Sequence, residues 1–108
     1  METTKVFVPL FVWLLGGSRI GGSYNAYYGS YTEHPGEAAW GQKVFNYAIY
    51  IEKVDERELL KASVFDGLRS FADAAVADAL ETEVFPCEEE SLVKVRAWLE
   101  EKCAKFFT

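Results

Sequence analysis

The stretch KVFNYAIYIEKV, residues 43–54, constrains the fold more than any other part of the chain. Every second position carries an apolar or aromatic side chain: Phe45, Tyr47, Ile49 and Ile51. The positions between them form a more polar set: Val44, Asn46, Ala48, Tyr50 and Glu52. Because successive side chains of an extended chain point to opposite faces, this alternation predicts a β-strand with one face in the core.

Two more strands are predicted before this one. Residues 6–15, VFVPLFVWLL, are apolar on both faces, which suits a strand covered on two sides, although Pro9 cannot donate to a ladder. Residues 23–31, SYNAYYGSY, form the next candidate, between glycines that permit tight turning and the turn sequence of residues 34–36. Three consecutive strands with short connections indicate a three-stranded antiparallel meander.

The hydrophobic period changes after residue 54. Apolar residues then recur three to four positions apart, which is the spacing of a helical stripe: Leu60, Val64, Leu68, Phe71, Ala75 and Ala79. Asp55 is the predicted N-cap of this helix, and Glu58 three residues later completes a capping box.

The last part of the chain predicts a short strand and a second helix. Residues 82–85 are β-prone and end at Pro86. The helix that follows has acidic residues at its positive end, Lys102 and Lys105 near its negative end, and an apolar face of Leu92, Val95, Leu99, Cys103 and Phe106. The whole pattern predicts one α+β domain over residues 1–108, a meander followed by helix, short strand and helix, with the helices packed on one sheet.

Two features bear on the compartment. Residues 6–15 follow Lys5 like the core of a signal peptide, but Glu2 spoils the positive flank and no A-x-A site follows, so a buried strand is preferred. Cys87 and Cys103 lie at a spacing that matches neither a disulfide framework nor a metal motif. We therefore expect reduced thiols in a cytoplasmic protein, with no membrane association and no bound metal or cofactor.

The charge is distributed unevenly. The formal net charge is -6, and residues 1–50 hold as many basic as acidic side chains, so the acidic excess lies in residues 51–108. An acidic half repels phosphate backbones, which argues against direct nucleic-acid binding. The same surface either solubilises the protein or attracts a basic protein partner, such as a nucleic-acid-binding protein.

The element order resembles a degenerate ribonuclease H-like fold. Residues 15–18, LGGS, are similar to the end of that family's first strand but lack its aspartate, Glu58 lies where the family has a helix-start glutamate, and Glu88 follows the fourth strand. The resemblance implies a two-metal nuclease site. The predicted first strand offers no carboxylate for such a site, so we expect no nuclease activity and no catalysis.

The run LGGSRIGGSYNAYYGSY, residues 15–31, is the most unusual feature of the chain. Its glycine-rich half lacks the GK[ST] ending of a P-loop and no helix is expected directly after it, but Ser18, Arg19 and Ser23 suit contact with an anion. A simple hairpin tip is the alternative. His34 is the sole histidine of the chain, and its place in a turn favours a surface residue over a catalytic base.

Four tyrosines follow the glycines: Tyr24, Tyr27, Tyr28 and Tyr31. Tyrosine offers a ring face and a hydroxyl, so it suits planar ligands and interfaces, although plain sheet surface is an equal alternative. On the last helix, Arg96 and Trp98 lie beside the apolar stripe, a position that suits contact with a neighbouring subunit. A solvated arginine and a half-buried tryptophan are an equal alternative.

These residues define a functional hypothesis with two alternatives. The hypothesis is a non-catalytic binding protein, a homo-oligomer that sequesters or senses a small nucleotide-like ligand, as some short phage proteins do. The expected ligand-binding residues are Ser18, Arg19, Ser23, Tyr24, Asn25, Tyr28 and Arg96, and the expected interface residues are Tyr27, Tyr31 and Trp98. The alternatives are an acidic inhibitor or adaptor of a protein partner, as in phage counter-defence, and, ranked last, a small hydrolase.

Overall fold

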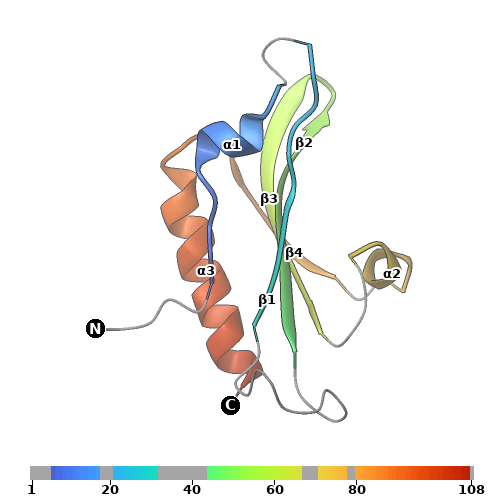
Figure 1. Cartoon of the computed structure of the whole chain (residues 1–108), viewed down its shortest axis with the longest axis vertical. Coiled ribbons are helices and arrows are strands. Elements are labelled where there is room, and N and C mark those ends of the chain that lie inside the picture. Colours follow the sequence, from blue (N-terminus) through green and yellow to red (C-terminus); the bar gives the residue numbers. More distant parts are fainter. Residues whose placement is uncertain (1–5, 18–20, 32–43, 67–70, 78–79, 108) are drawn as a thin grey trace.

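A computed structural model of the chain describes residues 6–17, 21–31, 44–66, 71–77 and 80–107. Within these residues the fold is α+β, with a four-stranded antiparallel sheet of order β1-β2-β3-β4 and three helices (Figure 1). The strands are β1 (Tyr27–Tyr31), β2 (Phe45–Val54), β3 (Arg57–Asp66) and β4 (Glu81–Pro86). The helices are α1 (Phe11–Leu15), α2 (Phe71–Val76) and α3 (Ser91–Phe106).

The strand predicted for residues 6–15 is wrong, because its second half forms the short helix α1. The helix begins after Leu10, which is extended, and the amide of Leu14 donates to the carbonyl oxygen of Leu10 at 3.2 Å. Leu14 is fully buried, whereas Val12 is 70% exposed. A strand covered on two sides would have buried both Val12 and Leu14. A short helix that buries Leu14 and leaves Val12 in solvent accounts for the difference.

The second predicted strand is shorter than expected. Pairing with β2 begins at Tyr27, where residues 23–31 were predicted. The residues before it complete the end of α1 instead: the Asn25 amide N donates to the Leu14 carbonyl oxygen at 3.0 Å, and its side-chain Nδ2 donates to the Trp13 carbonyl oxygen at 2.7 Å. Carbonyl groups left unpaired at the helix end are satisfied in this way.

The long helix predicted from Asp55 is also wrong, since the chain turns back there into β3. Val54 pairs with Arg57, and the two turn residues both have positive φ, 50° at Asp55 and 68° at Glu56. Two left-handed residues in a row are the mark of the two-residue hairpin turn that suits the twist of paired strands. Of the predicted helix, only Phe71–Val76 is helical within the described residues, as α2.

The sheet has two different faces. Its inner face carries Tyr47, Ile49, Leu60 and Ala62, all buried, and is covered by α1 and α3, while α2 lies against the opposite, outer face (Figure 1).

The predicted buried side of β2 is confirmed, and so is the apolar face of the last helix, where Val95, Leu99 and Cys103 are fully buried. The predicted short strand is confirmed as β4.

The Tyr47 side chain connects the N-terminal segment to this core by hydrogen bonds. Its hydroxyl accepts a hydrogen bond from the Phe7 amide and donates one to the Phe7 carbonyl oxygen, both at 2.9 Å. Burial raises the pKa of the Tyr47 phenol well above its ordinary value, and the hydrogen bond to Phe7 opposes that rise. The neutral phenol therefore anchors the N-terminal segment beside α1.

The positions that carry the ribonuclease H-like resemblance now lie in defined elements. Leu15 ends α1 and Glu58 lies on β3, neither of which is the element that the resemblance implies, whereas Glu88 follows β4. The resemblance itself stays a prediction.

Candidate functional site

An aromatic cluster on the outer face is the most distinctive group of side chains outside the core. Phe71, the first residue of α2, is its centre. The Phe71 ring centroid lies 5.4 Å from that of Tyr50, 5.7 Å from that of Tyr28 and 6.2 Å from that of Phe65. Because these partners come from β2, β1 and β3, one helical residue gathers side chains from three strands.

The cluster borders a groove of about 690 Å³, which is within the usual size range of small-molecule sites. Tyr28, Phe65 and Phe71 supply ring surface, and Ser30 and Asn46 supply a hydroxyl and an amide. Tyr28 is 58% exposed, although Ala48, directly opposite it on β2, is fully buried. The groove therefore combines an accessible aromatic ring with hydrogen-bonding side chains.

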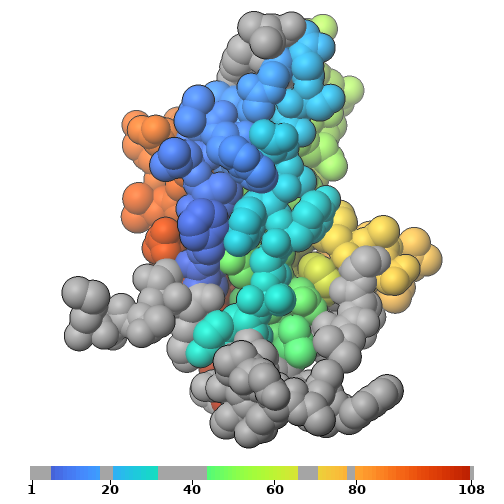
Figure 2. Space-filling model, viewed as in Figure 1, coloured from blue at the N-terminus to red at the C-terminus, as the bar shows by residue number. Residues whose placement is uncertain are grey.

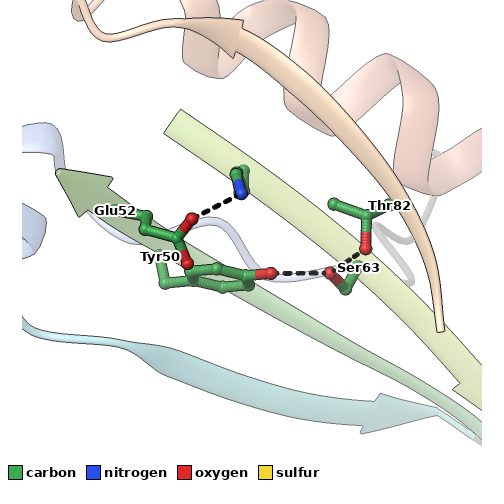
Figure 3. Close-up of polar contacts among 5 residues, drawn as sticks. Tyr50, Glu52, Ser63 and Thr82 are labelled. Carbon is green, nitrogen blue, oxygen red and sulfur yellow. Dashed lines mark hydrogen bonds and ion pairs between the residues drawn. The ribbon is translucent and has the colours of Figure 1, made fainter. Parts of the chain in front are cut away.

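A chain of hydroxyl groups lies on the same face (Figure 3). The Ser63 Oγ, which is fully buried, is 3.0 Å from the Tyr50 hydroxyl and 2.7 Å from the Thr82 Oγ1. Ser63 and Thr82 are directly opposite each other on β3 and β4, so the sheet register sets their contact. This network fixes the orientation of the Tyr50 ring, against which Phe71 packs edge-on.

One ion pair lies beside this network. The Lys61 ammonium donates to the Glu52 carboxylate at 2.7 Å. No lysine or arginine lines the groove among the residues that the structure describes. The described lining of the groove offers aromatic ring surface and neutral hydrogen-bonding groups.

The structure brings one of the predicted ligand-binding residues, Tyr28, into this groove. The Tyr24 hydroxyl donates to the Glu58 carboxylate at 2.5 Å, and the Asn25 side chain caps α1. Ser23 is exposed, and its carbonyl oxygen accepts from the Gly17 amide at 3.1 Å. Arg96 lies on α3, where its Nη1 donates to the Val6 carbonyl oxygen at 3.1 Å. Ser18, Arg19 and His34 lie outside the described residues.

The three predicted interface residues make ring contacts within the chain. Tyr27 packs beside Phe7, with ring centroids 5.2 Å apart, and Tyr31 packs on Phe107 at 5.6 Å. Trp98 packs on Phe85 at 6.4 Å, with the Lys102 ammonium 5.6 Å from its ring. All three side chains are half-buried, so part of each remains accessible.

Sequence reasoning missed Phe71, Phe65, Asn46 and Ser30 as members of a site. Asn46 and Tyr50 were placed on the polar side of the clearest strand, and that side is the outer face. The helical spacing after residue 54 predicts Phe71 in the buried stripe of a long helix, and a residue buried there would not line a binding site. The signal that could have found the site is the alternation in YYGSY, which sends Tyr28 and Ser30 to the face opposite Tyr27 and Tyr31.

Ion pairs on α3 lie away from the groove. Lys102 bonds the Glu81 carboxylate of β4, and this bond raises the pKa of the Lys102 ammonium. The hydrogen bond from Lys105, at 2.9 Å, lowers the pKa of the Glu101 carboxyl. Glu81, Glu101 and Lys105 are exposed and Lys102 is half-buried, so the two pairs contribute little to stability.

Three further findings concern the described residues. They contain no group of three or more histidine, cysteine, aspartate or glutamate side chains placed to hold a metal ion. None of their helices is long and apolar enough to cross a membrane. Cys103, on α3, is buried in the core, and Cys87 is half-buried.

Comparisons with protein-family models, curated proteins and solved structures found no match for this chain. The geometry of the outer face is therefore the basis for a functional proposal.

Proposed function

We propose that this chain is a non-catalytic binding protein that holds a planar heteroaromatic ligand, such as a nucleoside or the base of a nucleotide, in the groove of the outer face. The observation that carries the proposal is the ring of Tyr28, 58% exposed and backed by Phe71 on the rim of a 690 Å³ groove. An exposed aromatic ring that is held in place on one side is a ready surface for stacking.

The ring geometry favours one mode of stacking. The Tyr28 and Phe71 centroids are 5.7 Å apart and their planes are inclined by 55°, so a flat ligand does not fit between them. A ligand ring instead stacks on the accessible face of Tyr28. Phe71 then acts as a support, which lowers the entropy lost by the Tyr28 side chain when the ligand binds.

The polar residues of the groove supply the specificity. The side-chain amide of Asn46 offers both a donor and an acceptor, and the Ser30 hydroxyl offers either. These two residues are directly opposite each other on β1 and β2, so they form one polar patch beside Tyr28. Such a patch recognises the edge of a heteroaromatic ring by hydrogen bonds.

The same residues support binding over catalysis. The described side chains that line the groove carry no group that titrates near neutral pH, which a general acid or base needs. They also carry no cation for a phosphate group, so the proposal concerns recognition of the ring itself. The sequence-based hypothesis concerned a whole nucleotide-like ligand. The present proposal concerns only the base, which is the part that stacks on Tyr28.

Calorimetric titration with a panel of nucleosides and their monophosphates tests the proposal. Loss of one stacking contact costs about 1–3 kcal/mol, so Tyr28→Ala should weaken binding by roughly 5- to 150-fold, whereas Tyr28→Phe should bind nearly as well as the wild type. Val76→Ala is the matched control, since Val76 is a 90% exposed residue of α2 that does not line the groove.

A second candidate function has its own supporting observation. Glu88, Glu89 and Glu90 are consecutive residues after β4 and are all exposed, so they form an acidic segment suited to a basic protein partner. Binding of a lysine-rich peptide, measured at low and high salt, tests it. Weak, salt-sensitive binding that is lost when residues 88–90 become glutamine would support this candidate.

A further inference from the structure

A second groove, of about 300 Å³, lies between the N-terminal segment and α3, away from the outer face. One wall comes from Val8–Phe11, and the other comes from the turn before α3 and the first two turns of the helix, with Glu89, Leu92, Val93 and Arg96. Two of its apolar side chains are largely uncovered: Leu10 is 73% exposed and Val93 is 74% exposed. Figure 2 shows the blue N-terminal segment lying directly against the orange start of α3.

The wall formed by the N-terminal segment is held firmly to α3. The Arg96 Nη1 donates to the Val6 carbonyl oxygen at 3.1 Å, and the Val6 amide donates to the Glu100 Oε1 at 3.2 Å. The Tyr47 hydroxyl holds the next residue, Phe7. The exposed side chains of this surface are therefore ordered in advance, which lowers the entropy cost of covering them.

The α3 wall is complementary in charge to a second copy of itself that runs in the opposite direction. Glu89, in the turn before α3, and Arg96, on α3, line the same groove and are seven positions apart in the sequence. Leu92 and Val93 lie midway between them. The order along the wall is acid, apolar, apolar, base, and reversing the direction of a second copy exchanges the acid with the base.

We propose that two copies of this chain associate through this surface about a two-fold axis, with their α3 helices antiparallel. Leu92 of one copy then meets Val93 of the other at the axis, and Glu89 of each copy meets Arg96 of the other. Arg96 has further N–H donors after its bond to Val6, so it serves both contacts. Two ion pairs flank an apolar centre, which is the layout of a self-complementary interface.

The charges at the groove favour a second copy of the chain over a lipid surface as the binding partner. Glu89 lines the groove, and together with its exposed neighbours Glu88 and Glu90 it repels anionic headgroups. A second copy instead presents Arg96 to Glu89. The proposal is independent of the ligand groove, because α3 covers the inner face and the ligand groove lies on the outer face (Figure 1).

Sedimentation equilibrium of the full chain at several concentrations tests the proposal. The wild type should show a monomer–dimer equilibrium, and Val93→Glu should weaken dimerisation at least tenfold. Val76→Glu places the same charge on an exposed valine of α2, which is 90% exposed, and should leave the equilibrium unchanged. Circular dichroism checks that each variant is folded.

A charge exchange makes the test specific to the two-fold arrangement. Glu89→Arg alone and Arg96→Glu alone should each be largely monomeric, because each places like charges opposite one another at both ends. A mixture of these two variants should form a heterodimer, since both pairs become attractive again, and the double variant should recover self-association.

Three results would overturn the proposal: a wild-type chain that stays monomeric at all concentrations, a mixture of the two single variants that does not associate, or binding of the wild type to neutral lipid vesicles without dimerisation in solution.

Discussion

The ring of Tyr47 occupies the space that a side chain at Gly29 would fill. A Cβ atom at Gly29 would lie 2.4 Å from the Tyr47 Cζ and 2.5 Å from its hydroxyl oxygen. The two residues are directly opposite each other on β1 and β2, so the glycine lets the phenol cross the sheet surface and reach Phe7. The absence of a side chain at one position thus attaches the N-terminal segment to the core.

Gly29→Ala should destabilise the protein by about 1–3 kcal/mol, the usual cost of overpacking a filled site. The Tyr47 ring cannot move aside cheaply, because its hydroxyl is bonded to both backbone polar groups of Phe7. Urea unfolding followed by circular dichroism measures the change in the free energy of unfolding.

The control for this variant is Gly17→Ala. A Cβ at Gly17 would lie 3.5 Å from the nearest atom, the Gly22 Cα, which is ordinary contact. Equal losses of stability in the two variants would show that the Tyr47 ring does not depend on Gly29.

Tyr47→Phe removes the two hydrogen bonds to Phe7 and should cost about 1–3 kcal/mol near neutral pH. The pH dependence has a defined sign. Burial raises the pKa of Tyr47 in the folded protein, so in the unfolded chain this phenol ionises first, at its ordinary value near 10. The stability that the neutral phenol provides is therefore complete below pH 10 and declines above it, by up to about 1.4 kcal/mol per pH unit.

Unfolding experiments between pH 8 and pH 11.5 check this sign. The difference in unfolding free energy between the wild type and Tyr47→Phe should shrink as the pH rises through this range. Tyr28→Phe is the control, because Tyr28 is 58% exposed. A difference that stays constant up to pH 11.5 would contradict the buried neutral phenol.

Glu56→Gly should stabilise the protein by about 0.5–1 kcal/mol. Glu56 has φ of 68°, a conformation that costs free energy for any residue with a side chain and that glycine adopts freely. Glu56→Ala keeps that cost, so it should show no gain. Thermal unfolding of the three proteins side by side provides the measurement, and a loss of stability in the glycine variant would argue against this turn.

The hairpin that contains Glu56 shows where the sequence misleads. Leu60 and Val64 are four residues apart, a spacing that fits one side of a helix and also, with Ala62, one face of a strand. Pairing of β3 with β2 over ten residues on each strand decides in favour of the strand. The sequence Asp55-Glu56 is not a typical turn dipeptide, so local chemistry gave no warning of the reversal.

The strand β2 and the helix α3 were predictable, because the spacing of their apolar residues fits only one type of secondary structure. In β2, polar and apolar residues alternate over most of its length, and in α3 Val95, Leu99 and Cys103 recur at four-residue intervals, so each pattern has a single period. The helix α1 was not predictable, since five apolar residues carry no period and its end depends on Asn25, eleven positions beyond Leu14.

The candidate site was predictable only in part for the same reason. Tyr28 could be named from the tyrosine-rich segment, whereas its support by Phe71 depends on α2 folding over the outer face. Arg96, which the sequence suggested as a ligand contact, is used by the Val6 backbone. Local sequence therefore identified the stacking residue, and tertiary structure determined its neighbours.

The most direct test of the central claim, that a planar ligand stacks on Tyr28 in the outer groove, is nuclear magnetic resonance mapping during titration with the nucleoside that binds best in the calorimetric panel. We expect saturable shift changes concentrated at Tyr28, Ser30, Asn46 and Phe71, and their loss in Tyr28→Ala. Changes concentrated on α3, or no saturable changes with any nucleoside, would contradict the claim.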